Sequence, residues 1–258
     1  MHLIDTHAHL YLKEFEKDID LVIRRAHDHQ VKDFFLPCIS SKHIDSMYQL
    51  ESRFPNQMKL MMGLHPCSVT KDYLTELKLI QSELEKRHFY AIGEIGLDYY
   101  WTKEFQQEQI KALNIQIQWA IEYHLPIVLH TRESFDDVYE IIKSQHHPSL
   151  KGVFHCFTGT LNQAYKAIDL GFKLGIGGVV TFKNGGLDNI LKDIPLESIV
   201  LETDAPYLSP SPYRGKRNEP SFLIHILEKV CAIHQLDSET IIRKTMENTH
   251  ELFRSSSF

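Results

Sequence analysis

Short apolar stretches recur along the chain, and longer segments with apolar residues at helical spacing separate them. Each stretch is too short for a helix and is followed by turn or polar residues, which is typical of buried strands. The stretches are Leu3–Thr6, Phe34–Ile39, Leu60–Leu64, Tyr90–Ile95, Ile127–Leu129, Gly152–Phe154, Phe172–Ile176 and Ile199–Leu201. The segments between them with the clearest helical pattern are Lys13–His29, Asp72–Lys86, Lys103–Tyr123 and Ser134–Gln145. The pattern predicts alternating strands and helices.

This alternation predicts an α/β fold of parallel strands joined by crossover helices. Eight such units within 258 residues favour a (β/α)8 TIM barrel over a doubly wound open sheet. No GxGxxG or P-loop pattern follows the first predicted strand, which further weakens the nucleotide-binding sheet. The loop at residues 209–217 is too short to separate domains, and Ser238–Phe253 predicts one extra C-terminal helix packed on the outside. We therefore expect one domain, residues 1–258.

The charge of the chain limits the classes of partner. Its 28 Lys and Arg against 34 Asp and Glu give a formal net charge of −6, which argues against a protein that coats nucleic acid. Local contacts to phosphates are still compatible with this charge. No apolar run approaches the roughly 20 residues that span a bilayer, and Met1–Asp5 lacks the basic start of a signal peptide. We expect a cytoplasmic monomer without a membrane partner.

Side chains that can bind metal ions or carry protons follow six of the eight predicted strands. In a (β/α)8 barrel the active site lies at the C-terminal ends of the strands. The residues at these ends are His7, His9, His65, Glu94, His130, His155 and Asp204. The other histidines fall on predicted helices or connections, where we expect surface residues. A random scatter of histidines would not follow the strand ends, so the sequence predicts a metal centre here.

The spacing of His7 and His9 has a direct physical meaning. Strand side chains alternate, so both imidazoles face the same side and can reach one ion. With a further histidine and carboxylates, they make a mixed nitrogen and oxygen site that suits Zn²⁺ or Mn²⁺. Taken alone, the pair is a weak signal, and Glu94 alone would fit a core ion pair. Six of the residues at the strand ends, all except His65, are candidate ligands. Six ligands exceed what one ion needs, so we predict two divalent ions (Mg²⁺, Mn²⁺ or Zn²⁺) bridged by Glu94.

Groups suited to a phosphate or a nucleotide surround this predicted centre. Arg132 follows His130 by two residues, and Arg214 lies in the loop after the last predicted strand. Arginine offers a planar fork of donors to phosphate oxygens. Tyr99, followed by Tyr100 and Trp101, could stack on bases, although aromatics of this kind equally often pack inside loops. The sequence thus predicts substrate contacts at Arg132, Arg214 and Tyr99.

Together, these residues resemble the TatD family of metal-dependent deoxyribonucleases, within the amidohydrolase-like barrels. The resemblance covers the whole chain and rests on residues 3–10 (LIDTHAHL), 93–99 (GEIGLDY), 126–132 (PIVLHTR), 155–159 (HCFTG), 201–206 (LETDAP) and 214–220 (RGKRNEP). It implies that the metal ligands are His7, His9, Glu94, His130, His155 and Asp204. The chain departs from the usual family pattern at Tyr11, where Asp or Asn is common, and at Ser134, where Thr or Ala is common. We expect neither departure to touch an implied ligand, but Tyr11 could alter the floor of the substrate groove.

The resemblance implies hydrolysis of phosphodiester bonds at DNA ends, with RNA as an alternative, by a water that two metal ions activate. Asp204 would hold one ion and take the proton of that water. Arg132 and Arg214 would hold phosphates. His65 would contact a phosphate or the leaving oxygen, with a supporting role equally open, and Glu202 is expected as a supporting partner.

Two other functions are compatible with this sequence. The same barrel hosts small-molecule amidohydrolases, lactonases and esterases. Members of that kind with two ions often bridge them with a carboxylated lysine, and Glu94 stands at that position here. The second alternative is a scaffold or metal-storage protein, which requires closed coordination, whereas this ligand set leaves positions open.

Overall fold

Eight parallel strands form the centre of the computed structural model, which describes residues 1–101, 103–145 and 147–253. Their bounds are β1 (Leu3–Asp5), β2 (Val31–Pro37), β3 (Met58–Met61), β4 (Ile92–Asp98), β5 (Ile127–Arg132), β6 (Gly152–Phe154), β7 (Lys173–Ile176) and β8 (Ile199–Leu201). Every residue of β1, β4, β6 and β8 is buried. This matches a parallel sheet that is covered on both faces.

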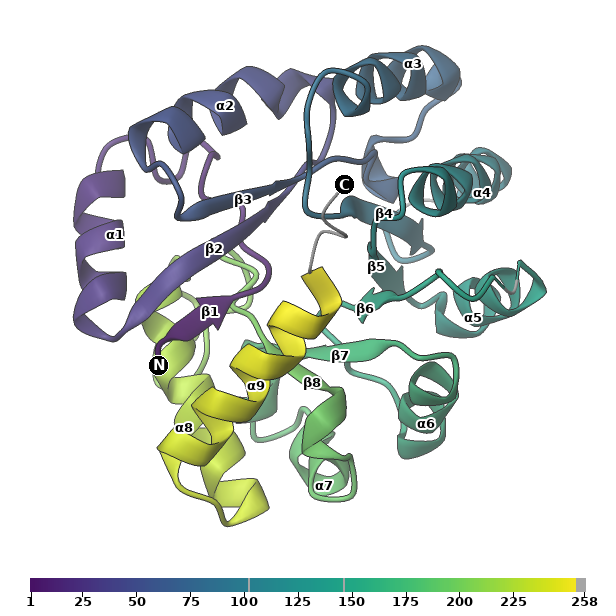
Figure 1. Cartoon of the computed structure of the whole chain (residues 1–258). Helices are drawn as coiled ribbons and strands as arrows, with labels where there is room; N and C mark the ends of the chain where they lie inside the picture. Colours follow the sequence, from purple (N-terminus) through teal and green to yellow (C-terminus); the bar gives the residue numbers. More distant parts are fainter. Residues whose placement is uncertain (102, 146, 254–258) are drawn as a thin grey trace.

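A helix follows each strand and packs outside the sheet, as the ring in Figure 1 shows. The helices are α1 (Ile19–Asp28), α2 (Ile44–Arg53), α3 (Tyr73–Leu84), α4 (Gln106–Glu122), α5 (Phe135–Ser144), α6 (Leu161–Asp169), α7 (Leu187–Leu191) and α8 (Leu223–His234). In α1 the buried residues are Ile19, Val22, Ile23 and Ala26, at the spacing of one helical face. The predicted (β/α)8 TIM barrel is confirmed.

Two short bridges close the barrel. Continuous ladders join β1 to β3 in one group and β4 to β8 in the other. Met62 pairs with Ile92 between β3 and β4, and Ala8 pairs with Ala205 just beyond β1 and β8. The second bridge brings the segment that carries His7 and His9 beside the segment that carries Asp204, so barrel closure assembles part of the predicted site.

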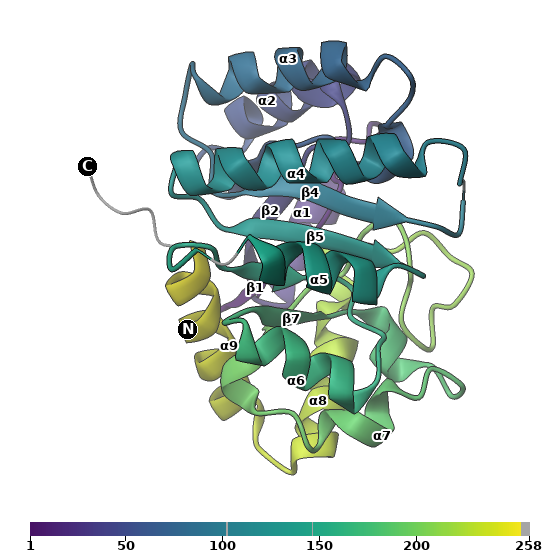
Figure 2. The same cartoon turned by 90° about the vertical axis from the view of Figure 1, so that its right-hand side faces the viewer.

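An extra helix, α9 (Ser238–Phe253), ends the described chain and covers the N-terminal end of the barrel. Leu252 and Phe253 join a buried cluster with the barrel residues Ile4, Phe35, Met61, Ala91, Val128, Val153 and Val200. The rings of Phe35 and Phe253 are 4.2 Å apart. The extra helix was predicted, but it closes the bottom of the barrel instead of joining the outer ring, because its last apolar residues fit the strand starts. Figure 2 shows β4 and β5 pointing away from α9, so the site lies at the opposite end.

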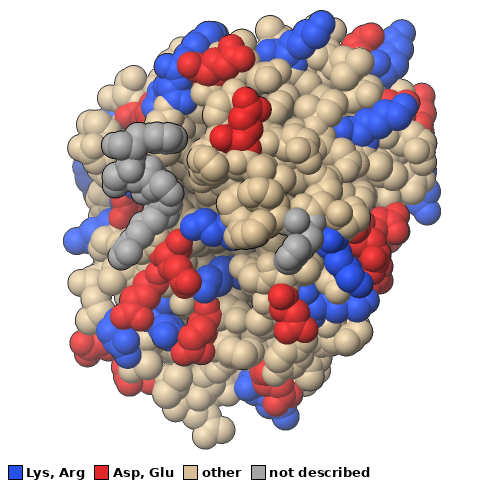
Figure 3. All heavy atoms as spheres, turned by 45° about the vertical axis from the view of Figure 1, so that its right-hand side comes forward, with Lys and Arg blue, Asp and Glu red and all other residues tan. Residues whose placement is uncertain are grey.

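The surface of the described part of the chain carries both signs of charge. Blue and red side chains are interspersed on the face shown in Figure 3. Charged side chains of the described residues form pairs, such as Lys166 with Asp136 at 3.1 Å and Lys173 with Glu251 at 2.9 Å. Among the described helices, none combines the length and apolarity needed to cross a membrane.

Candidate metal centre

The predicted ligands converge at the C-terminal end of the barrel. His7 and His9 lie just beyond β1, where the backbone amide of Asp204 donates to His7 O (2.8 Å) and that of His9 donates to Ala205 O (2.7 Å). Asp204 itself has a φ of 59°, in the left-handed region that Asp tolerates better than most residues. His7, His9, Glu94 and His155 are all buried. Buried polar side chains in such number need charged or hydrogen-bonding partners.

Glu94 of β4 lies at the centre of this cluster, and its two oxygens face different histidines. Oε2 is 3.2 Å from His7 Nε2 and 3.5 Å from His9 Nε2. Oε1 is 2.8 Å from His130 Nδ1 and 3.1 Å from His155 Nε2. Each oxygen therefore belongs to its own half of the cluster, which is the geometry expected of a carboxylate that bridges two ions.

The donor set fits divalent cations. Asp204 Oδ1 completes the first half of the cluster, 3.5 Å from His9 Nε2 and 3.7 Å from His7 Nε2. The two imidazole nitrogens of His7 and His9 face each other at 3.3 Å, which requires a proton or a cation between them. Potential ligand atoms lie within 4.8 Å of one another in three groups: His7, His155 and Asp204; His7, His9 and Glu94; and His65, Glu94 and His130.

Charge balance keeps Glu94 ionised. Burial alone would raise the pKa of this carboxyl, but His65, His155 and His7 hold it well below its usual range. The pKa of His155 is raised well above its usual value, because Glu94 and Glu202 outweigh the effect of burial. Burial lowers the pKa of His7. An anionic Glu94 surrounded by imidazoles is the electrostatic environment that a metal-bridging carboxylate needs.

Carboxylates behind the cluster orient two of the histidines. His130 Nε2 donates to Asp98 Oδ2 at 2.9 Å, which leaves Nδ1 directed at Glu94. His155 Nδ1 donates to Glu202 Oε1 at 3.2 Å, which leaves Nε2 directed at Glu94. Such partners fix the tautomer and the ring orientation of a metal-binding histidine. Glu202 lies where a supporting partner was predicted.

His65, just beyond β3, differs from the other histidines. Its Nδ1 accepts a hydrogen bond from the backbone amide of Cys67 at 3.0 Å, so the neutral ring carries its proton on Nε2. That Nε2 lies 3.3 Å from Glu94 Oε1. Although His65 belongs to one of the three groups of potential ligands, its tautomer makes it a donor at the mouth of the site.

Comparison with known protein families identifies the chain. The model of the family described as TatD related DNase matches residues 4–254. The chain belongs to the TatD family.

Relatives of this TatD protein are metal-dependent hydrolases by name. It is 34% identical to YabD of Bacillus subtilis (strain 168), named an uncharacterized metal-dependent hydrolase, over 98% of this chain and 99% of that protein. It is 32% identical to YcfH of Escherichia coli (strain K12), which bears the same description, over 98% and 96% of the two chains. The crystal structure of YjjV, a TatD homologue from Escherichia coli K12, superposes with a TM-score of 0.90 at 29% identity and covers 97% of each chain. The protein is a metal-dependent hydrolase of this family.

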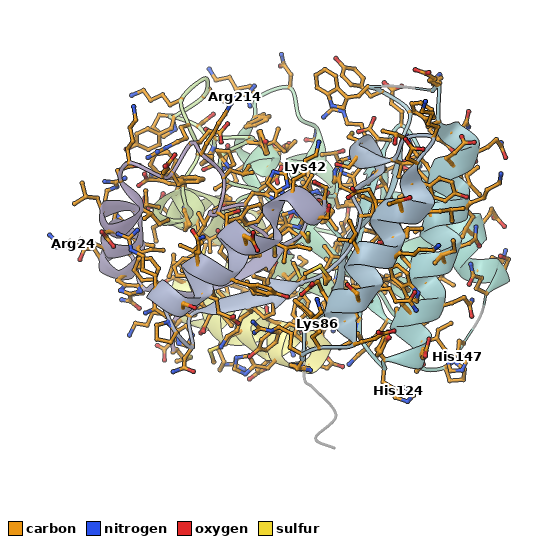
Figure 4. All side chains as sticks on the ribbon, turned by 90° about the horizontal axis from the view of Figure 1, so that it is seen from above. Arg24, Lys42, Lys86, His124, His147 and Arg214 are labelled. Carbon is orange, nitrogen blue, oxygen red and sulfur yellow. The ribbon has the colours of Figure 1, made fainter. Side chains whose placement is uncertain are left out.

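Two of the predicted substrate contacts of the TatD protein, Arg132 and Arg214, lie against aromatic rings. The Arg132 guanidinium lies 4.4 Å above the ring of Tyr100, beside a cavity of about 410 Å³ that His130, His155 and Asp204 also line. Arg214 lies on the ring of Phe182 at 3.6 Å. Figure 4 shows Arg214 at one end of the barrel and His124 and His147 at the other. These two histidines precede β5 and β6, so they lie at the end where the strands begin.

Tyr99 is the exception among the predicted substrate contacts. Its side chain is buried, and its hydroxyl donates to Asp137 Oδ2 at 2.8 Å. Its two neighbours are exposed, Tyr100 to 52% and Trp101 to 70%. The backbone amides of both neighbours donate to Asp98 Oδ1 at 2.9 Å. This placement favours Tyr100 and Trp101 over Tyr99 as groups that contact substrate.

Two buried glutamines of α4 hold the strand ends of the TatD site, and sequence analysis missed them. The Gln109 side chain accepts from the Asp98 amide at 2.9 Å and donates to the Asp98 carbonyl at 3.3 Å. Gln116 makes the same pair of bonds to Leu64, at 2.7 and 3.2 Å, next to His65. Asp98 was also missed as a ligand partner, although its four-residue distance from Glu94 on one strand places both on the same face.

Replacement of Gly175 by alanine is expected to disturb the site through Glu202. A Cβ at this position would clash with Glu202 Oε2 and would displace the carboxylate that orients His155. We expect destabilisation of about 1–3 kcal/mol, the usual cost of overpacking, together with weaker metal binding. Thermal denaturation with and without added metal measures both effects. Gly171→Ala, at an open position where a φ of +82° disfavours a side chain, is the control: it should destabilise the fold without moving Glu202 and leave metal binding unchanged.

Proposed function

We propose that this TatD protein is a deoxyribonuclease of the exonuclease type that hydrolyses phosphodiester bonds at DNA ends. The observation that carries the proposal is the position of Glu94, whose two oxygens face two separate sets of histidines. That geometry supports a pair of divalent ions, which clamp the attacking and leaving oxygens of a displacement. The description of the matching family as TatD related DNase supports the choice of substrate.

The proposed ligands divide between two half-sites. His7, His9 and Asp204 would hold one ion together with Glu94, and His130 and His155 would hold the other, also with Glu94. When bound, the ions supply Lewis acidity that lowers the pKa of an attacking water and polarises the phosphoryl group.

Asp204 is proposed as the group that accepts the proton of the attacking water. Its side chain is 13% exposed and borders the cavity at the barrel mouth, whereas Glu94 is almost fully buried. Its pKa lies below the usual value, because His9, His155 and His7 outweigh burial, so the carboxylate is ionised at neutral pH. His65 presents an Nε2–H at 3.3 Å from Glu94 Oε1 and is proposed to donate to a phosphate or leaving oxygen.

Exposed groups at the mouth support a single-stranded DNA end as the substrate. Arg132 offers donors to a phosphate next to the scissile one, and Tyr100 and Trp101 offer faces for bases. The net charge of −6 means that such contacts must be few and local. Arg214 is proposed as a more distant phosphate contact from the loop after β8.

The test is an assay of the metal-reconstituted protein on DNA oligonucleotides labelled at one end, with matched oligonucleotides blocked at either end. We expect release of mononucleotides from unblocked DNA and strong inhibition by one of the two blocks. A panel of lactones, carboxyl esters and amides is assayed in parallel. Turnover of a panel compound, without cleavage of any oligonucleotide, would instead make the protein a small-molecule hydrolase.

Trp101→Ala is expected to raise the KM for oligonucleotides while leaving a minimal aryl phosphodiester unaffected. Base stacking on one aromatic contributes about 1–3 kcal/mol, so KM should rise roughly 5- to 150-fold. Steady-state kinetics on both substrates measures the difference. Tyr165→Ala, which removes another exposed aromatic far along the chain, is the control and should change neither value. An equal rise in KM for both substrates would show that Trp101 does not bind the bases of DNA.

A further inference from the structure

Tyr11 lies between a proposed metal ligand and a neighbouring strand. The expectation that Tyr11 touches no implied ligand was wrong, because its hydroxyl is 3.0 Å from His9 Nδ1. The same hydroxyl donates to the carbonyl of Pro37, the last residue of β2, at 2.6 Å. The side chain is buried, with 8% exposure. A buried hydroxyl with two partners at these distances has a fixed hydrogen-bond direction.

Donor and acceptor counting determines this direction. The Pro37 carbonyl can only accept, so the single hydroxyl hydrogen of Tyr11 points to it. The hydroxyl oxygen must then accept from His9 Nδ1–H. A neutral His9 with its hydrogen on Nδ1 has its free lone pair on Nε2.

The free lone pair points at the first half-site. His9 Nε2 is 3.5 Å from Glu94 Oε2 and 3.5 Å from Asp204 Oδ1. We propose that Tyr11 is a positioning residue that selects the metal-binding nitrogen of His9 and thereby sets the metal affinity of the His7, His9 and Asp204 half-site. This inference rests on the proposed function only in its assignment of His9 as a metal ligand.

Tyr11 differs chemically from the residues that orient His130 and His155. Asp98 and Glu202 are carboxylates, whereas Tyr11 offers a neutral oxygen to His9. The half-site of His9 therefore gains orientation from its partner without a further negative charge. The hydroxyl also ties the segment after β1 to the last residue of β2.

The alternative role for Tyr11 is to line the substrate groove. It borders a cavity of about 710 Å³ with His43 and Tyr207, and its ring centroid lies 5.6 Å from that of His43. A groove residue would affect KM for DNA and leave metal binding unchanged. A positioning residue affects metal binding before any substrate is present.

The experiment titrates Mn²⁺ into the metal-free full-length chain and its Tyr11→Phe variant by calorimetry. Loss of a partner behind a metal ligand weakens binding roughly 10- to 100-fold. We expect that loss for one of two binding events, with the other changed less than about threefold. Tyr48→Phe removes a hydroxyl that donates to Glu83 at 2.7 Å, and as the matched control it should bind Mn²⁺ like the parent. Unchanged Mn²⁺ affinity in Tyr11→Phe would overturn the inference.

Nitrogen-15 NMR of the imidazoles tests the same inference in the unmodified protein. The His9 signals, assigned by their loss in His9→Gln, should show a hydrogen on Nδ1 in the metal-free parent, and a hydrogen on Nε2 would overturn the proposal. His9→Gln also separates the two hypotheses. If it binds two ions with parental affinity, the assignment of His9 as a ligand is wrong. If it loses one ion while Tyr11→Phe does not, only the role of Tyr11 is wrong.

Discussion

Glu94→Gln is expected to bind fewer metal ions than the parent and to lose nearly all turnover. The amide keeps the shape of the side chain but removes the negative charge and one of the two oxygens. One half-site then lacks its oxygen from residue 94, and the five imidazoles around this residue face a neutral group. Turnover should fall by at least the roughly 10²–10³-fold that loss of one electrostatic stabiliser costs. Metal analysis by mass spectrometry and steady-state kinetics measure the two effects.

The control for Glu94 is another buried carboxylate, whose ion-pair partner is an arginine of α1 instead of a histidine of the cluster. Glu219 is buried and pairs with Arg25 at 2.6 and 2.7 Å. Glu219→Gln should lower the free energy of unfolding and leave the metal content unchanged. A parent that binds a single ion, with the same stoichiometry in Glu94→Gln, would contradict the bridging role of Glu94.

The strands were the most predictable part of the fold. The bounds of β6 and β8 coincide with the apolar stretches, because a buried parallel strand needs apolar residues on both faces. Helix α4 was predicted to within three residues at its start and one at its end, as Lys103–Tyr123 against Gln106–Glu122. The length of its apolar pattern leaves few alternatives to a helix.

The start of α1 could not be predicted from periodicity. The sequence pattern begins at Lys13, but the helix begins at Ile19. Between them the chain makes successive turns, in which Leu12 bonds back to His9, Phe15 to Leu12 and Asp18 to Phe15. Such three-residue turns bury Phe15 with nearly the same spacing as a helix. Contacts from Arg217, which lies over the Phe15 ring and pairs with Asp18, stabilise the turns.

The candidate ligands could be predicted because their residue types are unusual at strand ends. Their supporting residues could not, since a glutamine on a helix or a tyrosine near a strand is most often a surface or core residue. Gln109, Gln116 and Tyr11 gain their roles from contacts that the fold creates between different elements, such as the bond from Tyr11 to Pro37 of β2. Likewise, nothing in three consecutive aromatics tells which is exposed, and loop packing buries Tyr99 but leaves Trp101 at the surface.

Asp204→Asn is expected to retain most of its metal and to lose roughly 10²-fold or more in turnover, the usual scale for removal of a general base. The amide keeps an oxygen that can bind the ion of the His7 and His9 half-site, but it is effectively non-basic. Glu202→Gln is the comparison variant on the same segment. It keeps an oxygen that can accept from His155 Nδ1 and is too buried to reach a substrate, so it should cost much less.

The rival view is that the attacking water needs no protein base and that Asp204 serves only as a ligand. The activity of Asp204→Asn would then fall only in proportion to its metal content. A titration of the variant with Mn²⁺, followed by both metal content and turnover, separates the two views. If Asp204 accepts the proton, turnover stays low at saturating metal, because a full complement of ions does not replace a missing base. If saturating metal restores parental turnover, proton transfer does not pass through Asp204, and its exposed position at the mouth reflects metal binding alone.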